Sequence, residues 1–205
     1  MKNLPKFYDC LEETKKEIFS LLFQGVKKRK SNFHNLVLST MGLDNNPNSR
    51  VVILRNFSPE ELSINIHSDF RADKITEIKK NKKVSLVFYD DNKKIQLRIR
   101  GKAKILEFTK KSWIKLSNWS RRCYLAIDKP GSESKFPTAG FPENYKNEAP
   151  TTDESELGQK NFSVIHVFID EIEWLFLASQ GHRRALFKIE RQNSEIKVKG
   201  KWLVP

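Results

Sequence analysis

The sequence alternates apolar and polar side chains most regularly between residues 94 and 106. A period of two over this length is typical of a half-buried antiparallel strand. Two shorter runs, 51–54 and 84–88, are rich in Val and aliphatic neighbours and predict buried strands. The apolar members of the alternation are Ile95, Leu97, Ile99, Ala103 and Ile105, and the polar members are Gln96, Arg98, Arg100, Lys102 and Lys104.

The same reasoning assigns elements along the rest of the chain. Apolar residues recur at helical spacing near the N-terminus, which predicts an amphipathic helix over 5–26. A second helix is expected after Asp69, with Ile75 and Ile78 on its buried face, and a third over 109–120. The expected strands cover 35–41, 50–57, 62–67, 84–90, 94–106, 162–169, 171–177, 183–190 and 196–203.

Residues 128–160 differ in composition from the rest. They hold most of the proline and glycine of the second half and few aliphatic side chains. We expect a long, loop-rich insertion, and loops of this length are usually functional or mobile. We treat residues 1–205 as a single domain that carries this insertion.

Few helical connections separate the strands, so a parallel sheet is disfavoured. These short antiparallel strands with an N-terminal helix predict a mainly β protein with flanking helices, in the form of a small barrel.

Charge and cysteine content limit the possible partners and the expected cellular location. The net charge of +13 fits either a lysine-rich solvated surface or a partner that is anionic, such as nucleic acid, a membrane surface or small phosphates. No apolar run of about 18 residues occurs, so we expect no membrane span. The N-terminus lacks a signal-peptide core, and two cysteines far apart indicate a reducing, cytoplasmic environment.

Neither a metal site nor a nucleophilic site is predicted. His34, His67, His166 and His182 lie far apart, without the spacings of zinc motifs. GxSxG and glycine-rich phosphate loops are also missing from the sequence. We therefore expect no bound metal.

Basic side chains near the strand ends offer a different chemistry. Arg50, Arg55, Arg71 and Lys74 form two clusters, and an Arg fork matches phosphate oxygens. The helix after Asp69 would add backbone N–H groups, with a hydroxyl from its neighbour Ser68. On spacing alone, the same cations could be ordinary solvated surface.

Three stretches together resemble a known family. SRVVILRNF at 49–57, IHSDFRADK at 66–74 and QLRIRGKA at 96–103 look like the FMN-binding split barrel of the pyridoxamine 5′-phosphate oxidase family. The spacing of Trp174 and Arg184, and the terminal KWLVP, also resemble it. The resemblance covers 34–108 closely and 162–205 loosely, and fails across 128–160.

The resemblance implies an FMN cofactor in a homodimer whose flavin sites lie at the subunit interface. It implies that Arg50, Ser68 and Lys74 bind the FMN phosphate and ribityl chain, with Arg71 replacing an arginine that the family has where this chain has Asp73. It also implies flavin contacts from Val51, Val52, Ile53, Leu54, Arg55, His67 and Gln96, and from Trp174 and Arg184 across the interface. On the substrate side it implies Arg55, Arg122 and His182.

This chain departs from the family's oxidases on the substrate side. A substrate-side arginine is replaced by Gln180, and a phosphate-gripping tyrosine is missing near Trp119. We therefore expect an FMN-binding flavoprotein, an oxidoreductase acting on a small molecule. The alternatives are a true pyridoxamine or pyridoxine 5′-phosphate oxidase, a non-catalytic flavin-binding module, and a basic nucleic-acid-binding barrel, of which the last is the least favoured.

Overall fold

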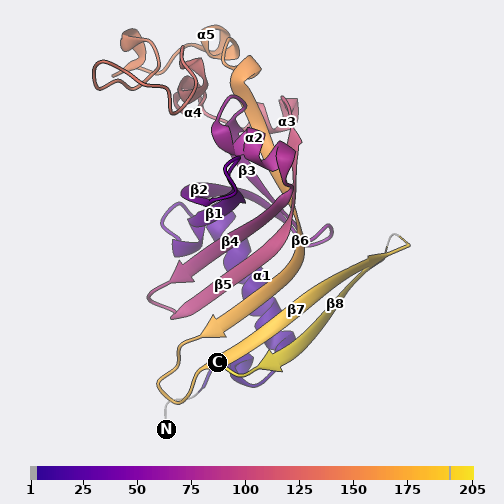
Figure 1. Ribbon diagram of the computed structural model, residues 1–205. Helices are drawn as coiled ribbons and strands as arrows, with labels where there is room; N and C mark the ends of the chain where they lie inside the picture. Colours follow the sequence, from indigo (N-terminus) through magenta and orange to yellow (C-terminus); the bar gives the residue numbers. More distant parts are fainter. Residues whose placement is uncertain (1–3, 194) are drawn as a thin grey trace.

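The computed structural model describes residues 4–193 and 195–205, and it consists mainly of one antiparallel sheet (Figure 1). The eight strands of this part of the chain are β1 (Asn35–Met41), β2 (Pro47–Ser58), β3 (Ser63–Asp69), β4 (Lys83–Asp90), β5 (Ile95–Leu106), β6 (Phe162–Phe176), β7 (Arg183–Gln192) and β8 (Glu195–Leu203). The α-helices are α1 (Leu11–Lys27), α2 (Asp73–Lys80), α3 (Lys110–Trp113), α4 (Asn118–Arg121) and α5 (Thr152–Glu156).

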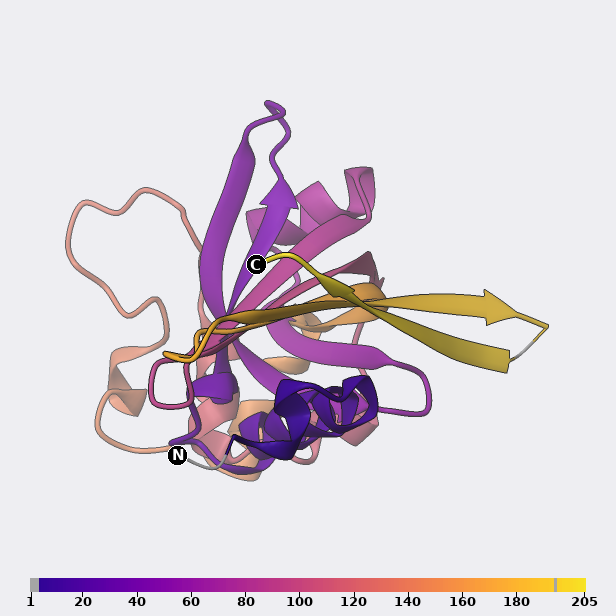
Figure 2. The ribbon, with the colours of Figure 1, turned by 90° about the horizontal axis from the view of Figure 1, so that it is seen from below.

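Six of the strands close into a barrel. The sheet order is β3-β2-β1-β4-β5-β6-β7-β8, and an additional pairing joins β3 to β6. The ring β3-β2-β1-β4-β5-β6 is therefore complete, while β7 and β8 continue outward as a long hairpin (Figures 1 and 2). Every pairing is antiparallel, as the sequence predicted.

The barrel is split between β2 and β3. These strands pair only from Leu54–Ile66 to Ser58–Ser63. The earlier part of β2, 47–53, pairs with β1, and the end of β3, 67–69, pairs with β6. At the point where the two strands part, a register shift between Leu54 and Asn56 leaves Arg55 as an extra residue. The second edge of β2 over 47–53 consequently faces the split.

The inward side chains of the strands and one face of α1 form the main core. Leu38, Leu54 and Leu86 are fully buried, as is Leu22 of the helix. Helix α1 lies between the barrel and the β7–β8 hairpin (Figure 1). The helix predicted over 5–26 is divided, because a short 3-10 helix at Lys6–Tyr8 precedes α1.

One long strand replaces two predicted ones. The strands expected over 162–169 and 171–177 are the single strand β6. Opposite its centre the register of β5 shifts between Arg100 and Gly101, which leaves Asp170 unpaired in the β5–β6 ladder without breaking the strand. Gly101 is required there, because a Cβ on it would collide with the carbonyl of Phe168.

The segment between β5 and β6 forms a separate region at one end of the barrel (Figure 1). The helix predicted over 109–120 is two short helices, α3 and α4, because the chain turns between them. The expected insertion over 128–160 is largely irregular, although it contains α5, which begins with a capping box between Thr151 and Glu154. Trp113, Phe162 and Val164 form a small core beneath this region.

Two remaining expectations concern the β7–β8 turn and a membrane span. Ser194, in the turn predicted between β7 and β8, lies outside the described residues. No helix in the described part of the chain is both long and apolar enough to cross a membrane.

Candidate functional site

Arg50 lies at the end of the barrel beside α2, held by a buried polar network. Its guanidinium donates to Thr40 Oγ1, to the Asn48 carbonyl at 3.3 Å and to Glu77 Oε2 at 3.1 Å. Thr40 and Asn48 also donate to the Glu77 carboxylate, at 2.5 and 2.6 Å. Arg50 is opposite Leu38 of β1, so the alternation of β2 directs it into the barrel end.

Glu77 is the centre of this network. Its side chain is only 6% exposed. Burial alone would raise the pKa of this carboxyl, but the hydrogen bonds from Thr40 and Asn48 and the charge of Arg50 hold the pKa below its usual value. The carboxylate is therefore charged at neutral pH, and it fixes the orientation of the Arg50 guanidinium.

Lys74 and Ser68 lie beside Arg50. The Lys74 ammonium donates to Ser68 Oγ at 3.3 Å, from the first turn of α2 to the end of β3. Burial lowers the pKa of Lys74, and the nearby Arg50 charge lowers it further. The lowered pKa is consistent with a Lys74 ammonium that is partly removed from water and only partly compensated by nearby carboxylates.

These residues fit a phosphate group. Two cations and a hydroxyl converge where the first turn of α2 presents backbone N–H groups. The cluster adjoins the split, where the second edge of β2 is free over the stretch that contains Val51, Val52 and Ile53. A flavin ring along this edge would find main-chain donors and acceptors, and FMN would place its phosphate at the cluster.

Arg71 is directed away from this cluster. Its guanidinium makes two bonds to the Asp69 carboxylate, the shorter at 2.8 Å, and donates to the carbonyls of Ile127 and Ala126 at 2.9 and 3.0 Å. Asp73 likewise pairs with Lys129 at 2.9 Å. Both residues therefore fasten the segment after α4 to the start of α2. A phosphate contact from Arg71 stays a prediction.

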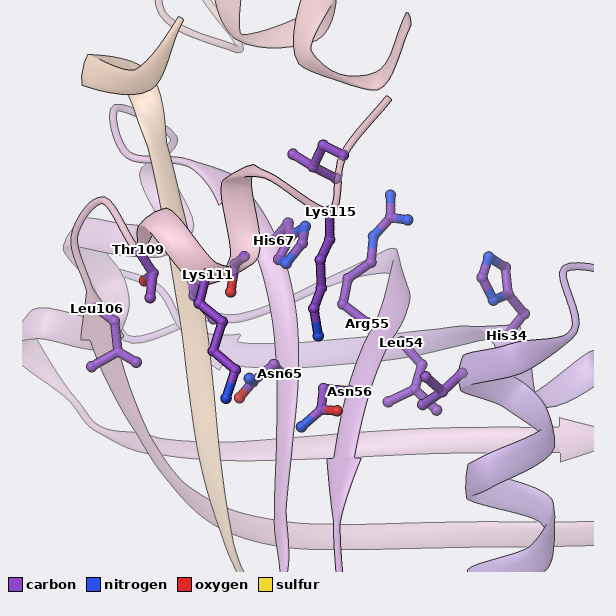
Figure 3. Close-up of a pocket in the computed structure, with 14 residues that line it drawn as sticks. His34, Leu54, Arg55, Asn56, Asn65, His67, Leu106, Thr109, Lys111 and Lys115 are labelled. Carbon is purple, nitrogen blue, oxygen red and sulfur yellow. The ribbon is translucent and has the colours of Figure 1, made fainter. Parts of the chain in front are cut away.

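Arg55 and His67 line a cavity of about 390 Å³ on the outer side of β2 and β3 (Figure 3). Burial lowers the pKa of His67 to about 4, with a further contribution from the Arg55 charge, so the imidazole is neutral at pH 7. Burial also lowers the pKa of Arg55. The Nε of Arg55 and the Nδ1 of His67 are buried, and neither has a hydrogen-bond partner among the described residues.

The outer face of the sheet holds a third group of predicted residues. Val51 is 67% exposed and lies in register with Val37, which in turn pairs with Val87. Farther along the same face Gln96 is opposite Leu175, and Leu175 is opposite Arg184. Over β1, β2 and β4 this face combines the three valines with Ser39, Ser49 and Ser85, and over β5 to β7 it carries Gln96 and Arg184.

An ion network occupies the part of this face over β5 to β7. Arg184 Nη2 and Arg98 Nη1 each lie 3.0 Å from Glu173 Oε1. The Nε of Arg184 is buried and has no partner within the described chain. Gln96 and Arg184 are thus on one surface, on the opposite side of the sheet from the Arg50 network.

Trp174 packs as a core residue. Its side chain is fully buried, stacked on Phe176 and edge-on to Phe7 and Trp202. The indole N–H has no hydrogen-bond partner among the described residues. A contact between Trp174 and a flavin stays a prediction.

The two other substrate-side residues do not line the cavity beside Arg55. Arg122 is stacked between Trp119 and Phe141 and donates to the Lys146 carbonyl at 3.1 Å, so it holds the irregular segment together. His182 lies in the loop between β6 and β7, at the opposite end of β6 from α3 (Figure 1). A shared substrate site of Arg55, Arg122 and His182 stays a prediction.

Several site residues could not be identified from sequence reasoning. Glu77 reads as one more charged residue of α2, and only its position between Ile75 and Ile78, on the buried side, hints at its role. Lys111 and Lys115 fall within the predicted third helix, and no motif connects them with the cavity that they line. No group of three potential metal ligands gathers in the described part of the chain.

Comparisons with known proteins identify relatives of this chain. The sequence profile of the pyridoxamine 5′-phosphate oxidase, FMN-binding domain family matches residues 15–107. Pyridoxine/pyridoxamine 5′-phosphate oxidase 2 of Arabidopsis thaliana is 28% identical over 124 residues, which cover 55% of this chain and 62% of that protein. The match therefore spans about three fifths of the length of that relative.

Two solved structures share the fold. A pyridoxamine 5′-phosphate oxidase-related, FMN-binding protein of Nostoc punctiforme superposes with a TM-score of 0.71 at 17% identity, covering 93% of this chain and 96% of that chain. PhzG of Burkholderia lata, solved with tetrahydrophenazine-1-carboxylic acid, gives 0.67 at 17% identity over 99% and 98%. These likenesses identify the split-barrel fold, as the sequence predicted.

The Glu77 network yields a prediction about stability. Replacing Glu77 with Gln should lower the free energy of unfolding at pH 7 by about 1–3 kcal/mol, because charge-assisted bonds to Thr40, Asn48 and Arg50 are weakened. Urea denaturation measures this. Glu12→Gln, at a 71% exposed side chain, is the control and should change the value by less than about 0.5 kcal/mol.

The pH dependence of the same variant has a defined sign. The folded-state pKa of Glu77 is lowered, so its contribution is present above the unfolded pKa and is lost as pH falls through the folded value. The difference between wild type and Glu77→Gln should therefore shrink below about pH 4.5. A difference that stays constant from pH 7 to pH 3 would contradict this account.

Proposed function

We propose that this chain, whose residues 15–107 belong to the pyridoxamine 5′-phosphate oxidase FMN-binding domain family, is an FMN-dependent oxidoreductase that acts on a small molecule. The observation that carries the proposal is the convergence of Arg50, Ser68 and Lys74 beside the free edge of β2. A phosphate there would relieve the desolvated Lys74 charge, and the adjoining edge offers main-chain groups to a planar ring.

In this proposal different residues bind the phosphate and orient the flavin ring. Arg50 and Lys74 bind the phosphate, and Glu77 keeps the Arg50 guanidinium in place. The main chain from Val51 to Leu54 orients the ring. When bound, FMN supplies the hydride or electron chemistry, while the protein supplies binding, orientation and electrostatics. The Arg55 cation, at the end of this stretch, would favour an anionic reduced cofactor.

We also propose a homodimer, with the flavin site at the subunit interface. Val51 is 67% exposed in the middle of β2 and is in register with Val37, which pairs with Val87, so the three valines would contribute apolar surface to the interface. The partner would bring its own Gln96 side of the sheet or its His182 loop toward this face. A cytoplasmic location is part of the proposal, and the two free, exposed cysteines Cys10 and Cys123 accord with it.

A second candidate is oxidation of pyridoxamine or pyridoxine 5′-phosphate. It is favoured by the Arabidopsis relative, which bears that name. Against it, Gln180 stands where the family's oxidases have an arginine, and Arg122 is committed to carbonyls of the irregular segment. We rank it second for this reason.

The phosphate assignment is tested by comparing FMN with riboflavin, which lacks the phosphate. The double change Arg50→Ala with Lys74→Ala removes two charge-assisted partners, each worth roughly 1.5–3 kcal/mol. FMN affinity, measured by fluorescence titration, should fall at least about a hundredfold. Riboflavin affinity should change less than about threefold. Equal losses for both ligands, or none, would refute the assignment.

The dimer is tested by light scattering. The wild type should have about twice the chain mass of 24.0 kDa. Val51→Lys places a charge in the proposed interface and should shift the mass toward the monomer at micromolar concentration. Val204→Lys, at an 86% exposed position near the C-terminus, is the matched control and should leave the mass unchanged. A monomeric wild type that binds FMN tightly would contradict the shared site.

The two candidate activities are separated by a direct assay. With FMN-saturated protein and oxygen as acceptor, we expect pyridoxal 5′-phosphate to form from pyridoxamine 5′-phosphate at less than about 0.1 per second. The expected cause is Gln180, which stands in place of the oxidases' arginine. Ordinary enzyme turnover starts near 1 per second. External reductants should nevertheless reduce the bound FMN. Turnover of about 0.1–1 per second or more at micromolar substrate would overturn this expectation and favour the second candidate.

A further inference from the structure

Three lysines gather on the outer face of the barrel where β4 and β5 pair. Lys102 and Lys104 alternate with the buried Gly101 and Ala103 along β5, so both lysine side chains point outward. Lys83 of β4 is directly opposite Lys102, and all three lysines are exposed. Alternate residues of a strand are roughly 7 Å apart and adjacent strands roughly 5 Å apart, so the lysines form one compact cationic group.

No carboxylate neutralises these lysines. None of the three forms an ion pair with a described residue. Arg100, the preceding outward residue of β5, does have a partner, because its guanidinium lies 3.1 Å from the Glu171 carboxylate. Like charges directly opposite each other destabilise a sheet, and Lys83 and Lys102 form such a pair. A bound anion would offset this repulsion.

Two flat rings lie next to the lysines on the neighbouring strand β6 (Figure 1). Phe168 is directly opposite Lys102 and is 37% exposed. His166 is opposite Lys104, and its ring packs edge-on against Phe168 with 4.5 Å between the centroids. Burial lowers the pKa of His166, so this ring adds little charge at pH 7. Each of two adjacent rows of the sheet therefore pairs a cation with a ring.

On its other side Phe168 borders an open cavity of about 450 Å³. The polar residues that line this cavity with Phe168 are Glu60, Glu61, Arg191, Gln192, Asn193 and Glu195. The Arg191 guanidinium donates to the Ile169 carbonyl at 2.8 Å, so it is held in place by the main chain. The glutamates would repel a phosphate, whereas carboxylate and amide groups pair well with the edges of nucleobases. Phosphates are thus favoured on the lysine side of Phe168, and a base is favoured on the cavity side.

We propose that the lysine–phenylalanine surface, made of Lys83, Lys102, Lys104, His166 and Phe168, binds single-stranded nucleic acid. The lysines contact phosphates of the backbone, and a base stacks on the Phe168 ring with its edge toward the cavity. Aromatic side chains on a sheet surface stack bases in this way, and a surrounding positive charge follows the backbone. A duplex keeps its bases stacked on one another and so offers no ring to Phe168.

This surface is additional to the proposed flavin site. None of its five residues lines the cavity beside Arg55, and none belongs to the hydrogen-bond network around Glu77. Binding of nucleic acid therefore does not depend on binding of FMN. An acidic polypeptide would satisfy the lysines but would leave Phe168 without a stacked partner, so it is the alternative that the experiments exclude.

Fluorescence anisotropy with a labelled oligothymidylate of about 12 nucleotides tests the proposal. The protein is saturated with FMN, so that the proposed phosphate cluster is occupied. At about 150 mM salt the dissociation constant should be below about 10 μM, and the duplex of the same length should bind about tenfold more weakly. A surface that senses charge alone would prefer the duplex, whose charge density is higher. Equal or tighter duplex binding, equal displacement by polyglutamate of the same charge, or no binding would overturn the proposal.

Lysine variants locate the backbone contacts. Replacing the three lysines of the surface with glutamine should weaken oligothymidylate binding about tenfold or more. It should also reduce the slope of log affinity against log salt by about 2, since each phosphate contact contributes about 0.7. The control variant removes the same charge from three exposed lysines of β8: Lys197→Gln, Lys199→Gln and Lys201→Gln. Equal losses in both triple variants, or no loss in the first, would contradict the site.

Aromatic variants test the stacking separately from the charge. Phe168→Leu keeps an apolar side chain but removes the ring, so affinity should fall about tenfold while the salt slope stays unchanged. Phe168→Trp restores a ring and should bind as the wild type does. Tyr89→Leu, at a 44% exposed position at the other end of β4, is the control and should change affinity less than about twofold.

Two outcomes of the aromatic series would refute the proposal. One is wild-type affinity in Phe168→Leu, and the other is a Phe168→Trp variant that binds as weakly as Phe168→Leu. FMN affinity, measured in parallel, should be the same in all these variants. A wild type that binds no FMN would therefore refute the proposed function alone, because the oligonucleotide titration on the same protein would still decide the nucleic-acid surface.

Discussion

The change of partner along β3 is the constraint on which the rest of the structure depends. A strand has two edges, and β3 uses one for β6 along its whole length while it shares the other with β2 only up to Leu54–Ile66. This arrangement closes the barrel and leaves the rest of β2 with a free edge. The extra residue Arg55 marks the point where the strands part. Arg50, Ser68 and Lys74 lie beyond this point, and the cavity lined by Arg55 and His67 lies on the outer side of β2 and β3.

The cations near the split differ in whether a buried carboxylate neutralises them. Arg50 is neutralised by the buried Glu77 carboxylate and fixed by Thr40 and Asn48, so its orientation is set before any ligand arrives. Lys74 and Arg55 are partly desolvated without such compensation, which lowers the pKa of each. An anion bound beside them would offset this electrostatic penalty. Oriented and uncompensated cations in adjacent positions are what a phosphate-bearing cofactor and an anionic ligand require.

The segment between β5 and β6 contacts the start of α2 and also lines the cavity beside Arg55. Arg71 donates to the carbonyls of Ala126 and Ile127, and Lys129 pairs with Asp73 at the start of α2. The same segment supplies Lys111 and Lys115 to the cavity roof. Its composition predicts an irregular loop, and its contacts attach it to the start of α2.

The sequence by itself determined most of the strands and their antiparallel order, because alternation and turn residues are local signals. The binding of a phosphate by Arg50, Ser68 and Lys74 stays a prediction from the resemblance. It could not determine that β6 is one strand, since a bulge opposite Gly101 is a property of two paired strands. Nor could it join Glu77 to Arg50, or Lys111 to Arg55. Those contacts exist only after the barrel closes, because closure alone brings residues from separate elements to the same end of the sheet.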